Sequence, residues 1–390
     1  MKPLHLLILI VSTNHTVMRG TTLCVLLTAV HLGASPVLVG LLAALFNAPV
    51  VFTSVAMGRV FDRGNARLPL LIAALVMSAG TVTAFLWGGL WPLFVVSLAV
   101  GTGYNVFVVG GHQQVGRHGG PADKVANYSM SMQANSLANF IAPIITGFAI
   151  DGIGHANTFL MLAALPLVSA VVLASGVLKF VPADAPAAGG GGAKRRGNAL
   201  ELLRPPLMRR IFTGAVLAFV ALNFYYFLVP VYGVQVGMSA SQIGMIVGAL
   251  GVAMVLVRGF APTVARRVRP WQMMIVSIAA TGIGLMVLPL FSQLGSLLAI
   301  SFVLGLVLGA GAPLALALMN EASPEGRGGE VMGLRLSILN GMQTVVPLGA
   351  GAISGAVGVA PVFAGLGLAL LAGAYYMRPQ WRGTAEKTNP

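Results

Sequence analysis

Four polar residues share one face of the first apolar stretch of the chain, residues 4–30. Ser12, His15, Arg19 and Thr22 follow one another at spacings of three and four residues, so they lie on one side of a helix. A guanidinium in a low-dielectric environment attracts an anion far more strongly than it does in water. An imidazole four residues away titrates near neutral pH. The pattern therefore predicts that Arg19 and His15 bind a substrate and that His15 also exchanges a proton.

The position of Arg19 near the middle of this stretch requires an explanation. A charged side chain at the centre of a membrane costs about 2.5–3.5 kcal/mol on insertion scales. We interpret Arg19 as a group that lines a wet cavity and binds an anionic or zwitterionic compound. The alternative is an arginine that is buried for packing and donates hydrogen bonds to the carbonyl groups of a neighbouring helix.

The overall composition is that of a polytopic membrane protein. Of the 390 residues, 57% are hydrophobic and 8% are charged, whereas a soluble domain carries about 25% charged residues. A spanning helix needs roughly 20 apolar residues, and the chain contains two sets of six such stretches. The first set covers 4–30, 37–57, 68–88, 91–113, 127–150 and 156–178, and the second covers 211–234, 240–262, 272–292, 295–319, 330–353 and 357–377.

The two sets are separated by a Gly-rich and basic stretch that is typical of a flexible linker. An ungapped shift of 204 residues pairs Gly33 with Gly237 and Pro143 with Pro347, so turns and helix-breaking positions coincide in the two halves. We therefore predict an N-terminal six-helix bundle over residues 1–180, a cytoplasmic linker over 181–210 and a C-terminal six-helix bundle over 211–390.

The net charge of +14 reflects the topology of the chain in the membrane. Of the 23 Lys and Arg residues, only Arg19, Arg258 and Arg335 fall within the apolar stretches, and all the others lie in alternate loops beginning with the N-terminus. This distribution follows the positive-inside rule. It predicts an even number of spans, two cytoplasmic termini and a multi-pass protein of the inner (plasma) membrane. A surface that binds nucleic acid is not expected.

The loop over residues 58–67 carries a specific pattern. Gly58, Asp62 and Arg63 occupy the first, fifth and sixth positions of a motif, and Asn65 stands at the eighth position, where the motif has Gly. The motif resembles the loop between helices 2 and 3 of the major facilitator superfamily of transporters. Together with the duplicated set of six spans, the resemblance covers essentially the whole chain. The chain is similar to bacterial, efflux-type members of this family with twelve transmembrane helices.

The resemblance implies an all-α membrane protein with the major facilitator fold, in which two six-helix bundles are related by a pseudo-twofold axis along the membrane normal. It also implies that the loop is part of a cytoplasmic gate, whose Asp helps to hold the outward-facing state. The gate residues that we expect are Gly58, Asp62, Arg63, Arg67 and Arg335. The alternative for the loop is a basic turn that only sets the topology.

Polar side chains in the other apolar stretches are candidates for the lining of the same cavity. His112, toward the cytoplasmic end of the fourth stretch, is a second candidate for proton coupling, and its alternative is a histidine at the membrane interface. The amides either bind a polar substrate or only hold helices together. The further substrate-binding candidates are Asn105, Asn135 and Asn139 in the first half, and Asn223, Tyr226, Asn340 and Gln343 in the second.

The family resemblance implies a secondary active transporter that works by alternating access and is coupled to protons. Short loops, together with Pro143 and Gly147 in the fifth stretch, are similar to those of family exporters and favour efflux of a small organic compound, anionic or drug-like. The alternatives are proton-driven uptake of an organic acid and a lipid flippase on the same fold. The expected partners are a small-molecule substrate, protons and membrane lipid, and the expected state is a monomer.

An enzyme is the less favoured class for this chain. His15 and His112 have no carboxylate at a matching depth, so no catalytic cluster is expected. The sequence has no Walker phosphate-binding pattern, so ATP is not expected to drive transport. Its single cysteine, Cys24, allows neither an internal disulfide nor a cysteine metal cluster, and we expect no cofactor and no metal.

Overall fold

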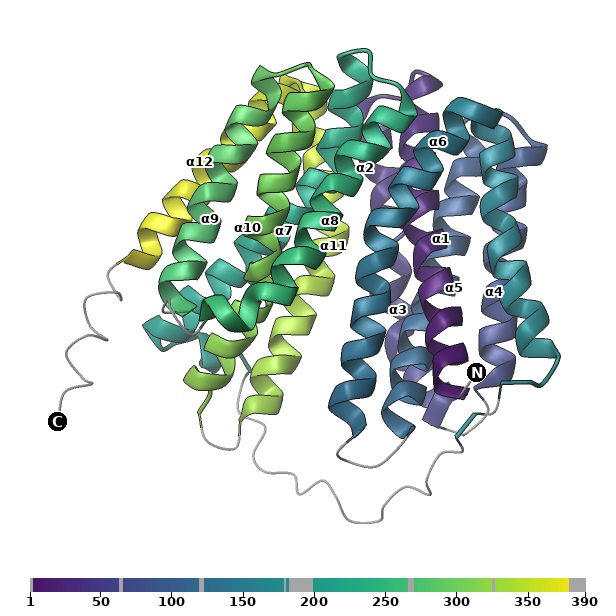
Figure 1. The fold of residues 1–390 in the computed structure, drawn as a ribbon, viewed down its shortest axis with the longest axis horizontal. Helices are drawn as coiled ribbons and strands as arrows, with labels where there is room; N and C mark the ends of the chain where they lie inside the picture. The colour runs from purple at the N-terminus through teal and green to yellow at the C-terminus, as the bar shows by residue number, and fades with distance from the viewer. Residues whose placement is uncertain are drawn as a thin grey trace. The chain divides into compact units, whose positions relative to one another are not determined.

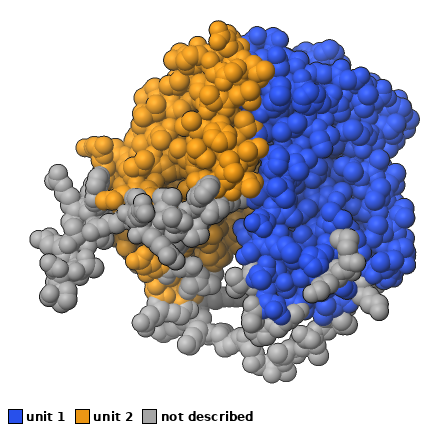
Figure 2. Space-filling model, viewed as in Figure 1, with its two compact units in different colours: residues 1–190, 233–248 blue, residues 191–232, 249–390 orange. Residues whose placement is uncertain are grey.

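The structure is a computed structural model and describes residues 3–62, 66–118, 123–178, 180–181, 199–265, 270–324 and 327–378. The regular structure within these residues is entirely helical (Figure 1). The chain forms two compact units. Unit 1 comprises residues 1–190 and 233–248, and unit 2 comprises residues 191–232 and 249–390 (Figure 2).

Unit 1 is built around the first helix of the chain. Its helices are α1 (Pro3–His31), α2 (Pro36–Leu45), α3 (Ala48–Asp62), α4 (Arg67–Leu86), α5 (Trp91–Arg117) and α6 (Asp123–Ala174). α1 packs along both α5 and α6, and α4 packs against the same two helices. Most of the middle of α1 is therefore buried inside unit 1.

The second apolar stretch forms two helices instead of the expected single one. α2 and α3 are separated at Phe46 and Asn47. Pro49, in the first turn of α3, has no N–H to donate to the carbonyl of Leu45, which interrupts the helical ladder of hydrogen bonds. The break is closely packed, because a Cβ on Gly101 of α5 would lie 2.3 Å from the carbonyl oxygen of Phe46.

The fifth and sixth apolar stretches form one long element, α6, of 52 residues. Gly154 interrupts it with φ 82° and ψ 166°, a conformation that residues with a Cβ rarely adopt. The interruption lies where the sequence predicts a loop. α6 therefore consists of two arms, one on either side of Gly154.

Unit 2 contains most of the second set of helices. They are η1 (Ala199–Leu203), α7 (Pro206–Gln235), α8 (Ala240–Ala265), α9 (Pro270–Val287), η2 (Leu288–Leu290), α10 (Leu294–Ala322), α11 (Gly328–Val357) and α12 (Val359–Met377). Within this unit, α9 packs against α10 and α12.

One segment groups differently from its neighbours in sequence. Residues 233–248, which include the end of α7 and the first turns of α8, belong to unit 1. The predicted domains over 1–180 and 211–390 differ from the compact units at this segment. Most of the predicted linker over 181–210 lies outside the described residues. The division into domains stays a prediction.

Ten segments among the described residues are long and apolar enough to cross a membrane. One of them, residues 126–174, runs through the turn at Gly154. α1 has 29 residues but is not among the ten, because its central polar residues lower its mean hydropathy. The protein is therefore an all-helical, multi-pass membrane protein, and the expected number of twelve spans stays a prediction.

Candidate functional site

A buried polar cluster surrounds His15, at the place where α1 meets α5 and α6. His15 is only 6% exposed. Its Nδ1 lies 2.6 Å from the hydroxyl of Tyr104 on α5, and its Nε2 lies 3.0 Å from Oδ1 of Asn139 on α6. One turn earlier on α1, the Ser12 hydroxyl donates to Oδ1 of Asn135 at 3.2 Å. The structure thus brings together His15, Asn135 and Asn139, three of the residues that the sequence predicts.

The hydrogen bonds define which nitrogen of the neutral His15 ring carries the proton. Oδ1 of Asn139 can only accept, so Nε2 of His15 donates to it. The other nitrogen, Nδ1, then accepts from the Tyr104 hydroxyl. Both nitrogens of the ring are therefore engaged, by two different helices, and the ring is held in one tautomer and one orientation.

Arg19 lies on the same helix as His15, four residues on, which corresponds to about 6 Å along the axis. Its side chain is half-buried. Its guanidinium interacts electrostatically with both His15 and Tyr104. The cluster therefore combines a positive charge with two groups that can change their hydrogen bonding, around a histidine that is buried. Such an arrangement suits the binding of an anion and of a proton at the same place.

Asn105 lies next to Tyr104 in the sequence but faces a different helix. Its amide nitrogen donates to Oγ1 of Thr53 at 2.8 Å, and its Oδ1 accepts from the Ser54 hydroxyl at 3.2 Å. Both partners belong to α3, and the Asn105 side chain is 2% exposed. The structure thus places Asn105 in the packing of α5 against α3 and does not bring it to His15.

His112 lies eight residues beyond Tyr104 on α5, about 12 Å along the helix axis. Its side chain is exposed. Its ring stands edge-on to Tyr128 of α6, with the centroids 6.4 Å apart, and the Tyr128 hydroxyl donates to its backbone carbonyl at 3.1 Å. The structure therefore separates His112 from the cluster around His15, and its predicted role in proton coupling stays a prediction.

The predicted site residues of the second half belong to unit 2 and are described by themselves. Asn223 of α7 donates to the carbonyl of Phe219 in its own helix at 2.8 Å. The ring of Tyr226 stands edge-on to that of Tyr225, with the centroids 6.0 Å apart. On α11, the Asn340 side chain is exposed and Gln343 is half-buried. Their substrate-binding roles stay predictions.

The predicted gate residues are only partly described. Gly58 and Asp62 lie in the last turns of α3, while the side chain of Asp62 and all of Arg63 lie outside the described residues. Arg67, at the start of α4, donates to the carbonyl of Leu178 at 3.3 Å and so ties α4 to the chain beyond α6. Arg335 is half-buried on α11 in unit 2.

Tyr104 is the site residue that the sequence analysis missed. The sequence analysis names Asn105 instead, the next residue along the chain, which lies on a neighbouring face of the same helix. Tyr104 could have been found from its depth in the membrane. It lies about as far from the cytoplasmic end of the fourth apolar stretch as His15 lies from the start of the first, so its hydroxyl is expected at the same depth as His15.

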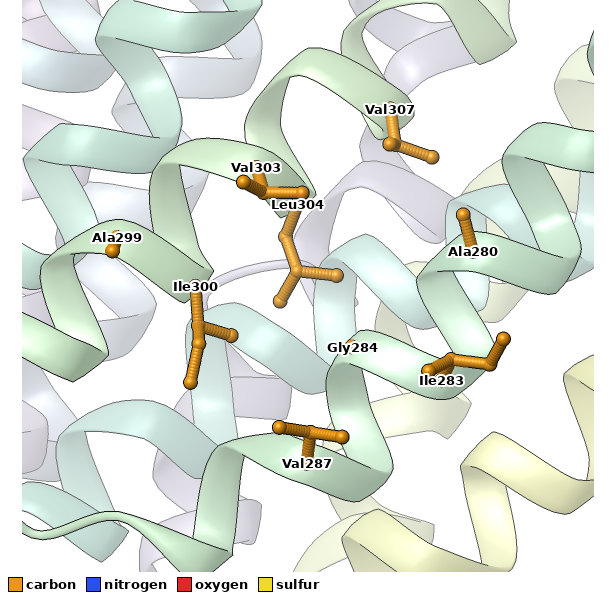
Figure 3. A pocket seen from close by; sticks show the side chains of 9 residues that line it. All are labelled: Ala280, Ile283, Gly284, Val287, Ala299, Ile300, Val303, Leu304 and Val307. Carbon is orange, nitrogen blue, oxygen red and sulfur yellow. The ribbon is translucent and has the colours of Figure 1, made fainter.

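Unit 2 contains an apolar groove of about 420 Å³ between α9 and α10. Figure 3 shows the side chains that line it, all of them aliphatic or glycine. Two of them, Ile283 and Val303, are 54% and 56% exposed. A groove without a polar group, with lining residues exposed on spanning helices, suits a lipid acyl chain and not a polar solute.

Comparisons with known proteins agree with this architecture. The sequence profile described as Major Facilitator Superfamily matches residues 7–296 and 237–389. No curated protein matches the chain. Among solved structures, a point mutant of the nucleoside transporter NupG has a TM-score of 0.80 at 16% identity, and the match covers 96% of this chain and 100% of that one.

Two further solved structures show the same likeness. A bacterial homologue of the human lysosomal transporter Spinster, inward-facing and unoccupied, has a TM-score of 0.74 at 14% identity, with 97% of this chain and 95% of that one covered. A POT family transporter in complex with a thioalcohol-conjugated peptide has a TM-score of 0.73 at 14% identity, with 98% and 96% covered. At these identities the structural likeness establishes the fold, and the profile match over nearly the whole chain establishes the family: the protein belongs to the major facilitator superfamily of membrane transporters.

Proposed function

We propose that this protein is a proton-coupled secondary transporter that exports a small organic anion by alternating access. The observation that carries the proposal is the buried His15, held between Tyr104 and Asn139 and about one helical turn from Arg19. A charged group inside a membrane protein is costly and marks a functional site by default. The cluster has an imidazole, which can bind and release a proton, beside a guanidinium, which keeps its charge.

Arg19 supplies the affinity for an anion in this proposal. Its planar guanidinium offers several donors in a fixed arrangement that matches a carboxylate. The attraction between the two is strong because the site is largely shielded from water. The structurally similar proteins include a nucleoside transporter and POT family transporters in complex with a thioalcohol-conjugated peptide and with 5-aminolevulinic acid. These compounds are small polar organic molecules, which supports this class of substrate.

Export is supported by the close packing of α6 against the first turns of α8 inside unit 1. A Cβ on Gly147 would lie 2.3 Å from the carbonyl oxygen of Ala240, and a Cβ on Gly244 would lie 2.3 Å from that of Pro143. Each of the two helices therefore has a glycine at the point where it contacts the backbone of the other. The residues from 142 to 147 are those that resemble the fifth-helix motif of family exporters.

Proton-driven uptake of an organic anion is the second candidate, and the nearness of Arg19 to His15 favours it. The Arg19 charge disfavours a second positive charge on His15, and an anion bound to Arg19 removes that penalty. Substrate and proton would then bind together, as symport requires. Export would require the proton and the substrate to compete for the protein.

Transport in proteoliposomes decides between the two directions. Organic acids, nucleosides, short peptides and phospholipids are first screened for thermal stabilisation of the purified protein. The stabilising compound is then loaded inside vesicles or added outside them, with the outside made acidic. Export coupled to protons predicts faster loss of the loaded compound, and uptake predicts accumulation inside. Equal rates with and without the pH gradient would exclude proton coupling, and stabilisation by phospholipid alone would favour a flippase.

A matched pair of arginine variants connects the result to the site. Arg19→Gln is expected to abolish binding of an anionic substrate, whereas Arg378→Gln, which removes an exposed arginine at the end of α12, is expected to leave it unchanged. Equal binding by the two variants would mean that Arg19 serves only the structure.

A further inference from the structure

The direction of the hydrogen bond between His15 and Tyr104 depends on whether His15 is protonated. Tyr104 donates its hydroxyl hydrogen to Nδ1 of the neutral His15 ring over 2.6 Å. The two rings are tilted by 51°, with their centroids 5.4 Å apart, and the hydroxyl lies within hydrogen-bond distance of Nδ1. This hydrogen bond can exist in this direction only while Nδ1 carries no proton.

Protonation of His15 reverses the direction of this hydrogen bond. The incoming proton binds to Nδ1, because Nε2 already carries the hydrogen that it donates to Asn139. Nδ1 then becomes a donor, and the Tyr104 oxygen becomes its acceptor. No covalent bond of Tyr104 breaks, but its O–H must rotate away from His15, because two donors cannot face each other at this distance.

The rotated hydroxyl needs another acceptor. The neighbouring charged group is Arg19, whose guanidinium has donors and no acceptor. A group that accepts hydrogen bonds from both Arg19 and Tyr104, such as the anion proposed for this site, would satisfy a hydroxyl that turns toward Arg19. Such an acceptor would avoid the cost of a lost hydrogen bond.

We propose that Tyr104 is the positioning residue that couples the proton to the substrate: its hydroxyl points to His15 while His15 is neutral, and to an anion on Arg19 once His15 is protonated. This inference rests on the proposed anion site and on proton-driven uptake, the second candidate direction, because in it the proton and the anion bind together. It adds a hydrogen-bond relay to the direct attraction between charges. Tyr104 acts through His15 and needs no proton transfer of its own.

The surroundings of His15 contain few other groups that could act in this way. The charged or titratable groups that interact with it are Arg19 on α1 and Tyr104 on α5, while α6 presents the uncharged amides Asn135 and Asn139. The sequences of α1 and α5 contain no Asp or Glu. The acidic residues of α6 are Asp123 and Asp151, and both lie at least a dozen residues from Asn139.

The test uses the full-length purified protein with nitrogen-15-labelled histidine, and reads the protonation of His15 by nuclear magnetic resonance. The chain has six histidines, and the signal of His15 is the one that disappears in His15→Gln. Benzoate serves as the probe anion. The two variants to be compared are Tyr104→Phe and its control Tyr128→Phe, which removes a hydroxyl that donates to the His112 carbonyl instead.

In the wild type and in Tyr128→Phe, neutral His15 is expected to carry its proton on Nε2 alone. Benzoate is expected to raise the ratio of charged to neutral His15 about tenfold at constant pH, which is the effect of one hydrogen bond to a charged group. In Tyr104→Phe, both tautomers are expected, and the effect of benzoate is expected to fall severalfold. The same tautomer and the same benzoate effect in Tyr104→Phe would overturn the relay, as would the absence of a benzoate effect in the wild type.

A second variant tests the relay even if Tyr104→Phe does not fold. Replacement of Tyr104 by 3-fluorotyrosine keeps the ring and the hydroxyl but weakens the oxygen as an acceptor, so a smaller change in the same direction is expected. An unchanged ratio of charged to neutral His15 in this protein would contradict the relay. Failure of the proposed transport function would look different, because the proteoliposome assay would then show no pH-driven flux while the relay remained visible in the spectra.

Discussion

The carboxylate of Asp151 caps the start of α8 by accepting two backbone hydrogen bonds, from Ser241 at 2.8 Å and from its neighbour Ala240 at 3.1 Å. Asp151 lies on α6, three residues before the turn at Gly154. The first N–H groups of a helix have no partner within the helix, and its N-terminus attracts negative charge. The carboxylate therefore ties the first turn of α8 to α6, and this contact contributes to the grouping of residues 233–248 with unit 1.

Asp151→Asn is expected to loosen this attachment, because the amide keeps one acceptor but loses the charge. Spin labels at Asn157 and Gln235, which are both exposed, should then report a broader distance distribution with a longer component. High salt should weaken the wild-type contact in the same direction, since Asp151 is itself exposed. Asp123→Asn, at the other end of α6, is the control and should leave the distribution unchanged. An unaltered distribution in Asp151→Asn would contradict the attachment.

The close approach of α6 and α8 predicts a large effect of one added methyl group. In Gly244→Ala the new Cβ would lie 2.3 Å from the carbonyl oxygen of Pro143, a backbone atom that cannot move aside alone. Overpacking of this kind costs about 1–3 kcal/mol of unfolding free energy. Gly341→Ala on α11 meets no atom within 4 Å and is the control. Thermal unfolding in detergent should show a loss for Gly244→Ala only, and equal midpoints for both would disprove the tight contact.

His15 of α1 and His112 of α5 should differ in their effect on coupling. His15→Gln removes the titratable group of the buried cluster, so transport is expected to lose its response to an imposed pH gradient. His112→Gln is expected to keep this response, because its side chain is exposed and lies about 12 Å along α5 from Tyr104. The opposite result would move the proton site to His112.

Replacement of Arg19 by lysine tests the form of the cation as well as its charge. Arg19→Lys keeps the positive charge but loses the planar pair of donors, so the affinity for an anionic substrate should fall only partly. Arg19→Gln should abolish it. Isothermal titration of the two purified variants measures this order, and a lysine variant as weak as the glutamine variant would show that the geometry of the guanidinium, and not its charge, is decisive.

The predicted topology can be tested by cysteine labelling in intact cells. Cysteines at Asn157 and Gln293, both exposed and in or beside the loops without basic residues, should react with an impermeant thiol reagent from outside. A cysteine at Arg378 should not react. The native Cys24 is fully buried, so it should give no background. Labelling at Arg378 in sealed cells would reverse the proposed orientation.

Much of the fold was predictable because its signals are long and repetitive. The spans follow from uninterrupted apolar stretches, and the turn in α6 follows from Gly154 between two of them. The division between α2 and α3 was not predictable from hydropathy, because the apolar stretch continues through Phe46. It depends on Pro49 and on how closely α5 approaches.

The site was predictable only as far as single helices allow. The spacing of Asn135 and Asn139 places both on one face of α6, and the structure turns that face toward α1. The choice of Asn105 over Tyr104 shows the limit, because adjacent residues on a helix point about 100° apart. The rotation of a helix about its own axis is set by packing against its neighbours, which the sequence of one helix does not contain.

The polarity of α1 also has a consequence for how the protein is made. α1 is synthesised before α5 and α6, but it is not among the described segments that are apolar enough to cross a membrane by composition. Its hydrogen-bond partners Tyr104 and Asn139 follow His15 by 89 and 124 residues, which corresponds to roughly 4–25 s of translation at about 5–20 residues per second. We expect α1 to remain beside the insertion machinery or in the polar headgroup region during this interval. Its stable entry into the bilayer is then expected to follow the arrival of α5 and α6, so that the order of insertion differs from the order of synthesis.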